Sequence, residues 1–406
     1  MSKRILVISQ HFWPENFRIT DICAGFTQRQ ITVDVLCGLP NYPAGVLYPG
    51  YSYFKPRRQT LDGIEIYRCG EIPRKGNTGA RIFLNYISYP LSATFHLLRL
   101  IGKHYDAVFC FETSPVLMAF PAIIWSKLTR TPFTMYVLDL WPENLYSVLD
   151  VQSPFLRKIA QNVSWWHYKK ADKLIAMSPA LREKLIAITG KAADKVTVVP
   201  QYAESLYEQD VYDAQLAARF ANTFNVVFAG NISPAQGLEG LVAIAQRLKA
   251  EHITDVRFVI VGDGMSKNDL QAQIAASNVE SYFVFEGQHP VADVPAYHTM
   301  ADVLFAGLKS SGEIGLTIPA KIFSYLAAGR PVLCSMDGEG ALTVEKAACG
   351  FSCKAGDAKA LYENFIKLYN MPAAQRKQLG KNGRAYHEQH FKREKLLGKL
   401  IDFIFA

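Results

Sequence analysis

Short apolar segments alternate with amphipathic stretches along almost the whole chain. Each apolar segment is followed by a helical periodicity, which predicts parallel strands covered by helices on both faces. In the first half we expect strands at 5–9, 32–37, 64–68, 107–112, 133–138, 173–177 and 196–199. The series restarts with strands at 225–230, 256–261, 282–286, 303–308 and 331–335. Helices are expected at 17–29, 116–129 and 154–170, among others.

A polar segment, 204–222, separates the two strand series and predicts a hinge. A chain of 406 residues also exceeds one ordinary hydrophobic core. We therefore expect an α/β protein with two doubly wound, Rossmann-like domains, 1–205 and 206–385, that face a central cleft. The tail from 373 predicts two or three helices, and 386–406 are expected to pack back on the first domain.

The segment 317–332 predicts a loop that opens into a helix between two strands. Pro319 suits the first turn of this helix and Gly329 suits its end. Lys321 then lies where backbone N–H groups, the helix dipole and an ammonium converge, an arrangement that favours a phosphate or diphosphate. The alternative is that Lys321 is an ordinary solvated lysine on a crossover helix.

Glycine-rich turns follow two strands of the second half. The first is bounded by two glycines and can offer backbone N–H groups to phosphate oxygens; its candidate residues are Gly230, Asn231, Gln236 and Gly237. The second is a Gly-Asp-Gly sequence, 262–264, which is also typical of a simple tight turn. Neither matches a Walker loop or a dinucleotide-binding fingerprint.

Polar and aromatic residues crowd the loops after the first two strands. The candidates are His11, Trp13, Glu15, Asn16 and Arg18 in the first loop and Asn41 and Tyr42 in the second. Loops at strand ends carry function more often than other connections, although aromatic residues there can simply cover the sheet.

Asp139 ends the apolar strand 133–138, and Glu143 follows Pro142 in the expected first turn of a helix. A carboxylate at this edge can accept a proton, orient a hydroxyl or stabilise positive charge on a sugar ring. Both residues also suit a helix cap, a role more common for Glu143.

Charge is distributed unevenly along the chain. The net charge is +8, with 24 Lys and Arg against 15 Asp and Glu in 1–205, and 20 against 21 in the remainder. No nucleic-acid-binding motif accompanies the basic half. Its segment 82–98, flanked by basic residues, can lie on an anionic membrane surface or form a buried helix.

Seven cysteines without a paired framework fit a reducing cytoplasm, and no signal peptide is visible at the start. Cys349 and Cys353 lie close together, but no second pair completes a metal site. We expect a cytoplasmic protein that binds the inner face of the membrane peripherally.

With these motifs placed, the chain resembles glycosyltransferase family 4, retaining enzymes of the GT-B fold. The donor-domain motifs follow in the family's order at 228–237, 262–264, 285–287 and 321–332. The first loop together with 41–43, 139–143, 230–237 and 317–319 resembles a narrower group. That group includes N-acetyl-L-fucosamine transferases of bacterial O-antigen and capsule synthesis.

The resemblance implies transfer of a sugar from a nucleotide diphosphate sugar, UDP-linked, to a lipid-linked (undecaprenyl diphosphate) saccharide. It implies catalytic roles for Asp139 and Lys321. The implied donor-binding residues are Gly230, Asn231, Gln236, Gly237, Gly262, Asp263, Gly264, Gly287, Glu313, Thr317, Ile318 and Pro319. The implied acceptor-binding residues are His11, Trp13, Glu15, Asn16, Arg18, Asn41, Tyr42 and Glu143. No cofactor or metal is expected, because the sequence contains no Asp-x-Asp.

The chain departs from the family pattern at four positions. Asn231 and Gln236 stand where much of the family has two cations. Leu316 and Ser324 occupy the positions of the family's glutamate pair, and Glu313 is nearby but out of register.

Two other functions fit the same architecture. A nucleotide-sugar 2-epimerase would convert the donor without any lipid acceptor, and a two-lobed sugar-binding protein would perform no chemistry. The crowding of charged residues at strand ends favours an enzyme.

Overall fold

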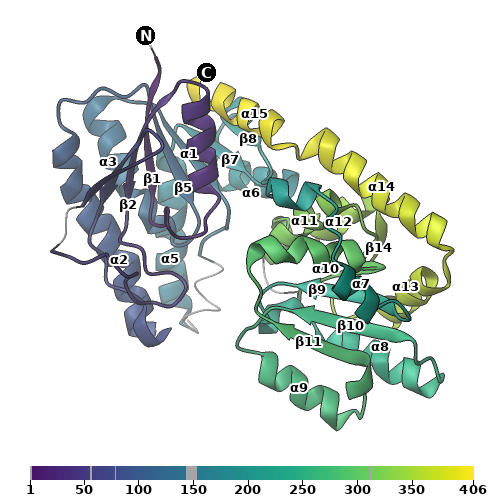
Figure 1. The fold of residues 1–406 in the computed structure, drawn as a ribbon. Coiled ribbons are helices and arrows are strands. Elements are labelled where there is room, and N and C mark those ends of the chain that lie inside the picture. Colours follow the sequence, from purple (N-terminus) through teal and green to yellow (C-terminus); the bar gives the residue numbers. More distant parts are fainter. Residues whose placement is uncertain (1, 55–56, 78, 143–152, 311–312) are drawn as a thin grey trace. The chain divides into compact units, whose positions relative to one another are not determined.

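The computed structural model describes residues 2–54, 57–77, 79–142, 153–310 and 313–406. They form two compact units, which are described separately (Figure 1). The first unit is Met1–Val199 with Leu397–Ala406, and the second is Pro200–Leu396.

The first unit is built on an eight-stranded sheet in the order β3-β4-β2-β1-β5-β6-β7-β8. Its strands are β1 (Arg4–Ser9), β2 (Thr32–Cys37), β3 (Arg58–Leu61), β4 (Ile64–Arg68), β5 (Ala107–Glu112), β6 (Phe133–Val137), β7 (Lys173–Ala176) and β8 (Val196–Val198). Neighbouring strands are parallel except β3 and β4, which form an antiparallel hairpin. The central strands are buried, as expected for a sheet covered on both faces.

Helices cover this sheet. They are α1 (Ile19–Gln28), α2 (Gly79–His96), α3 (Phe120–Thr129), α5 (Pro154–Lys170) and α6 (Pro179–Thr189), with short 3₁₀ turns that include η2 (Leu97–Leu100) and η3 (Val116–Ala119). Both α2 and α5 pack against η3. The last helix, α15 (Arg393–Phe405), ends on the first unit, where Lys173 donates a 2.9 Å hydrogen bond to the carbonyl oxygen of Phe403.

The second unit is built on a parallel six-stranded sheet in the order β11-β10-β9-β12-β13-β14. Its strands are β9 (Phe224–Ala229), β10 (Val256–Val261), β11 (Phe283–Gly287), β12 (Val303–Gly307), β13 (Val332–Ser335) and β14 (Gly350–Cys353). Its helices are α7 (Ala214–Arg219), α8 (Glu239–Ala250), α9 (Lys267–Ala276), α10 (Val294–Met300), α11 (Ala320–Ala328), α12 (Glu339–Lys346), α13 (Ala358–Asn370) and α14 (Ala373–His390). Residues of α8, α9 and α13 form a hydrophobic core with the sheet.

The expected α/β fold with two parallel sheets is confirmed, and the strands predicted from apolar segments are present. Two strands were missed, β3 and β14. The sequence of β3 is polar and its residues are exposed or half-buried, so it lacks the apolar signal of a central strand. Residues 116–129 form the turn η3 followed by α3 rather than one helix.

The segment 82–98 lies mostly in α2, and its two faces differ. The buried face consists of Ile82, Asn85, Tyr86, Tyr89, Pro90 and Ala93. The opposite face exposes large apolar side chains, with Phe95 74 % and Leu98 of η2 65 % exposed. Large apolar side chains therefore lie on both faces, and the alternative of a buried helix holds for one face only.

Glycines allow the loops after β9 and β10 to pack in direct contact. The amide of Gly230 donates to the carbonyl oxygen of Val261 at 2.9 Å. A Cβ atom at Gly262 would lie 2.0 Å from the carbonyl oxygen of Gly230, and one at Gly264 would lie 2.3 Å from that of Ile232. Side chains at 262 and 264 would therefore push the two loops apart.

Replacing Gly262 with alanine should lower the melting temperature more than replacing Gly287. Both glycines have positive φ, +134° and +74°, and such a backbone costs an L-residue about 1–2 kcal/mol in the left-handed region. A Cβ at Gly287 meets nothing within 4 Å, whereas one at Gly262 also meets the backbone of Gly230. Thermal unfolding of the two variants tests this, and equal losses would contradict the packing argument.

Candidate functional site

The ammonium of Lys321 lies at the start of α11 in the second unit. Its Nζ is 3.9 Å from the centre of the Phe228 ring and donates a hydrogen bond to Oε1 of Gln236. A Cβ placed on Gly230 would lie 3.8 Å from the same Nζ. The structure therefore joins two motifs that were predicted separately, the Lys321 helix and the loop after β9.

Burial lowers the pKa of Lys321 from its usual value to about 7. An aromatic face and a neutral amide surround the ammonium, and within the described residues no carboxylate forms an ion pair with it. Its positive charge therefore remains available to an anion.

The backbone around Lys321 differs slightly from the sequence expectation. Helix α11 begins at Ala320, so Pro319 is its N-cap rather than a residue of its first turn. Gly329 ends the helix in the left-handed conformation, as predicted, with φ of +65°. Ile318 is buried, and Thr317 and Glu313 are half-buried in the loop before the helix.

The remaining predicted donor residues lie at the same edge of the sheet. The amide of Ile232 donates to the carbonyl oxygen of Asp263 at 2.9 Å, and the amide of Gly262 donates to that of Gly287 at 2.7 Å. Asn231 is exposed next to Gly264. The loops after β9, β10 and β11 are thus joined through their backbones, and they meet the Lys321 helix through Gln236 and Gly230.

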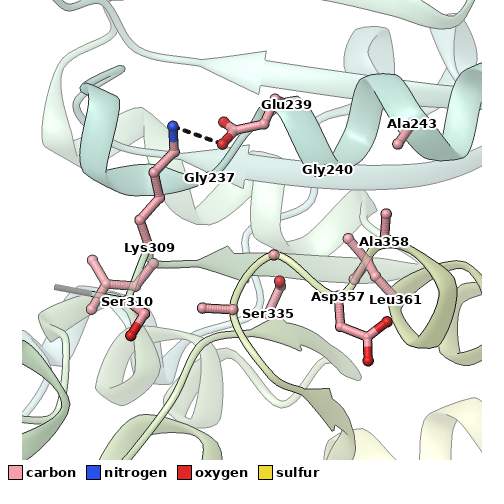
Figure 2. Close-up of a pocket in the computed structure, with 13 residues that line it drawn as sticks. Gly237, Glu239, Gly240, Ala243, Lys309, Ser310, Ser335, Asp357, Ala358 and Leu361 are labelled. Carbon is pink, nitrogen blue, oxygen red and sulfur yellow. Dashed lines mark ion pairs between the residues drawn. The ribbon is translucent and has the colours of Figure 1, made fainter.

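A pocket of about 420 Å³ opens on the α8 and α13 side of this edge (Figure 2). Gly237 is the only predicted donor residue that lines it. Lys309 points across the pocket and forms a 2.7 Å ion pair with Glu239 at the start of α8. The pocket's cation is therefore already paired, and Lys321 does not line the pocket.

In the first unit, the two predicted loops meet at the carboxylate of Glu15. The backbone amides of Asn41 and Tyr42 donate to its Oε1 at 2.9 and 2.7 Å. His11 lies 3.1 Å from its Oε2 through Nδ1. Burial alone would raise the pKa of Glu15, but the interactions with His11, Tyr42 and Asn41 outweigh burial and lower it. Glu15 is buried and joins the two loops through these interactions, so it stabilises the loop cluster from its interior.

Aromatic rings make up much of this loop cluster. The rings of His11 and Phe17 are stacked 4.6 Å apart, and the Tyr42 ring lies 5.4 Å from that of His11. Tyr42 is 44 % and Trp13 37 % exposed, Asn16 is exposed, and Arg18 is the half-buried N-cap of α1. Aromatic faces with polar edges are suited to sugar rings.

A second buried carboxylate, Glu71, extends the cluster and was not predicted from the sequence. It accepts hydrogen bonds from Gln10 at 2.7 Å and from Asn41 at 2.5 Å. Burial raises the pKa of Glu71 to about 8, although the hydrogen bond from Gln10 lowers it. Glu71 follows β4 at the same edge of the sheet as Gln10 after β1. A polar residue in a loop after a strand was the pattern that indicated His11, and Glu71 shows the same pattern.

Asp139 is half-buried just beyond β6. Its neighbour on β5 is Glu112, a fully buried residue whose two carboxyl oxygens have no hydrogen-bond partner in the described part of the chain. Burial raises the pKa of Glu112 well above its usual range, and the charge of Asp139 raises it further. Glu143, the other predicted carboxylate of this segment, lies outside the described residues.

Within the described ranges, no cluster of three or more His, Cys, Asp or Glu side chains could hold a metal ion. The described cysteines are all free.

Comparisons with known proteins assign both halves of the chain. Residues 16–201 match the glycosyl transferase 4-like domain, and residues 217–386 match the glycosyl transferases group 1 family. One relative is named a colanic acid biosynthesis glycosyl transferase, WcaI of Escherichia coli (strain K12), 24 % identical over 309 residues that cover 73 % of each protein. The 2-deoxystreptamine N-acetyl-D-glucosaminyltransferase of Niallia circulans is 20 % identical over 79 % of each protein.

Solved structures share the fold at low sequence identity. HepE of Anabaena, solved in complex with UDP, superposes with a TM-score of 0.69 at 16 % identity, covering 98 % of both chains. WaaG, a glycosyltransferase involved in lipopolysaccharide biosynthesis, gives a TM-score of 0.68 at 13 % identity, covering 99 % of this chain and 100 % of WaaG. These similarities show the GT-B fold. With a glycosyl transferase 4-like domain followed by a glycosyl transferases group 1 domain, the chain has the domain composition of a glycosyltransferase.

Proposed function

We propose that this glycosyltransferase moves a sugar, with retention of configuration, from a UDP-linked donor to a lipid-linked saccharide in bacterial surface polysaccharide synthesis. The sugar is N-acetyl-fucosamine or a similar hexosamine, because the sequences 139–143 and 317–319 resemble those of N-acetyl-L-fucosamine transferases. The acceptor is an undecaprenyl diphosphate saccharide of an O-antigen or capsule. The colanic acid relative supports a surface polysaccharide, and the structure of HepE with UDP supports the nucleotide.

The observation that carries the proposal is the enclosed ammonium of Lys321 at the start of α11. A diphosphate leaving group gains negative charge as the glycosidic bond breaks. Lys321, the amides at the start of α11 and the glycine loop at Gly230 are positioned to stabilise that charge. Such preorganised donors are typically worth ~10²–10³ in turnover each. Asn231 and Gln236 supply neutral hydrogen bonds where related enzymes use cations.

On the first unit, we assign the acceptor to the loop cluster around Glu15 and to Asp139. Glu15 fixes the loops, and the exposed Trp13 and Tyr42 offer aromatic faces to a sugar. Asp139 orients the acceptor hydroxyl or stabilises the oxocarbenium-like centre. We further propose that the reaction needs no metal, because the sequence has no Asp-x-Asp, the usual signature of a metal-bound sugar nucleotide.

A lipid-linked acceptor requires contact with a membrane surface. Within the described residues, no helix is long and apolar enough to cross a bilayer. The exposed face of α2 and η2 carries Leu84, Leu91, Phe95 and Leu98, which recur at helical spacing and which we name the α2 stripe. The N-terminal half of α5 adds Phe155, Leu156 and Ile159 with the exposed Arg157 and Lys158. Apolar side chains beside cations are suited to an anionic membrane interface.

UDP affinity should depend on pH through Lys321. The lysine has a pKa of about 7 without ligand, and a bound diphosphate raises it by favouring the charged form. Below pH 7 the ammonium is already charged, so Lys321 adds no pH dependence there. Above pH 7 binding must take up a proton, so affinity should fall about tenfold per pH unit until the pKa of the complex is reached. Calorimetry from pH 6 to 9, with EDTA present, measures this.

The variant Lys321→Met should bind UDP more weakly and lose the pH dependence, because its side chain has no proton to gain. Lys309→Met is the matched control, since Lys309 is paired with Glu239 outside the site. Unchanged UDP binding by Lys321→Met would refute the assignment of Lys321. Failure of the wild type to bind UDP, GDP, dTDP or ADP would refute the proposed activity.

Membrane binding should depend on the α2 stripe. The double variant Phe95→Glu, Leu98→Glu places two anions on exposed positions, so sedimentation with phosphatidylglycerol vesicles should fall several-fold without loss of melting temperature. Met265→Glu, at an 83 % exposed position of the second unit, is the control for added charge. Equal binding by both variants would contradict the docking surface.

A further inference from the structure

Buried carboxylates in the first unit fall into two classes. Asp34 is fully buried and paired, since its Oδ2 accepts bonds from Arg4 at 3.0 Å, Lys103 at 2.7 Å and Tyr105 at 2.5 Å. Glu112 is equally buried, yet neither of its carboxyl oxygens has a hydrogen-bond partner among the described residues. A buried ion without partners is costly, so stability alone does not explain Glu112.

The strand register places Glu112 beside Asp139. Glu112 is the last residue of β5 and pairs with Val137, the last residue of β6. The amide of Leu138 donates to the carbonyl oxygen of Glu112 at 3.1 Å, so the chain leaves β6 tied to β5 immediately before Asp139. Paired residues on neighbouring parallel strands lie on the same face of the sheet, so Glu112 and Val137 share a face. Side chains two residues apart on a strand also share a face, so Asp139 is expected on the same side as Val137 and Glu112.

The loops on either side of this pair are fixed by hydrogen bonds. Trp141 donates from Nε1 to Oγ of Ser114 at 3.1 Å, and its backbone amide donates to the hydroxyl of Tyr168 at 2.9 Å. The Trp141 ring packs edge-on against Tyr86 of α2 at 5.3 Å. The segments after β5 and β6 are thus held together, which fixes the backbones that carry Glu112 and Asp139.

Among the described residues, no cation compensates the charge of an ionised Glu112. In the part of the chain that is described, Asp139 is the charged group that acts on Glu112, and the Cys110 thiol on the same strand is the other titratable group coupled to it. Two carboxyl groups in such a setting do not both ionise at neutral pH. The charge belongs on the half-buried Asp139, which water and ligands can reach, rather than on Glu112.

We propose that Glu112 is a positioning residue that acts through Asp139, the two side chains forming a carboxyl pair in which Glu112 keeps a proton and Asp139 carries the single negative charge. A protonated Glu112 has an O–H to donate toward Asp139 or toward a substrate hydroxyl held there. The role of the pair toward the acceptor rests on the function proposed above for Asp139. The existence of the pair does not depend on that function.

Infrared titration of the full chain tests the pair without any substrate. A protonated carboxylic acid has a carbonyl band that a carboxylate lacks. In the wild type this band should persist above pH 8, where Glu71, with a pKa of about 8, loses its own contribution. Glu112→Gln should lose the persistent component. Asp139→Asn should keep it but shift its titration to lower pH, by about one unit or more, because the like charge is gone.

Two controls separate the pair from unrelated effects. Glu71→Gln should remove only the component that titrates near pH 8. Cys110→Ser, an equally buried change on the same strand, should leave the Glu112 component in place. Glu112→Gln replaces the protonated acid with an amide of nearly the same shape. Asp139→Asn tests the coupling while Glu112 stays in place.

An identical band in wild type and Glu112→Gln across the pH range would overturn the proposal, and so would a Glu112 titration that Asp139→Asn does not move. Failure to bind nucleotide diphosphates would refute the proposed activity but leave these spectra unchanged. The two failures are therefore distinguishable.

Discussion

The second unit depends on an ammonium held against an aromatic ring at the start of a helix. The ammonium of Lys321 lies over the Phe228 ring and donates a hydrogen bond to the neutral Gln236. Among the described residues, no carboxylate forms an ion pair with it. Burial without a counter-ion lowers its pKa to about 7, which keeps the lysine ready to gain full charge when an anion arrives. The glycines at 230, 262 and 264 let the loops after β9 and β10 close around this point because no side chain separates their backbones.

The first unit shows a different arrangement, in which buried carboxyl groups organise the loops at the strand ends. Glu15 and Glu71 organise the loops after β1, β2 and β4, and Glu112 lies beneath Asp139. The exposed cations and apolar side chains of α2 and α5 lie on the outside of the unit. In the proposed function, these exposed side chains meet a membrane and the loops bind a neutral, hydroxyl-rich ligand.

Most of the fold was predictable because buried parallel strands leave a strong apolar signal. The polar edge strand β3 was missed for the lack of that signal. In the site, Lys321 and the glycine loops were found because helix starts and strand-end turns have local sequence patterns. Their junction through Gln236 was not predictable, since it joins positions far apart in the chain. Glu112 was overlooked because an acidic residue inside an apolar strand shows its lack of partners only once its surroundings are known.

The central claim is that a nucleotide diphosphate binds at the start of α11. Amide hydrogen exchange measured by mass spectrometry, with and without UDP, tests it most directly. We predict that UDP slows exchange at 230–237, 262–264 and 317–322 in the wild type, and that Lys321→Met reduces this protection. Protection confined to the residues around Lys309 and Asp357, which line the separate pocket, would contradict the account.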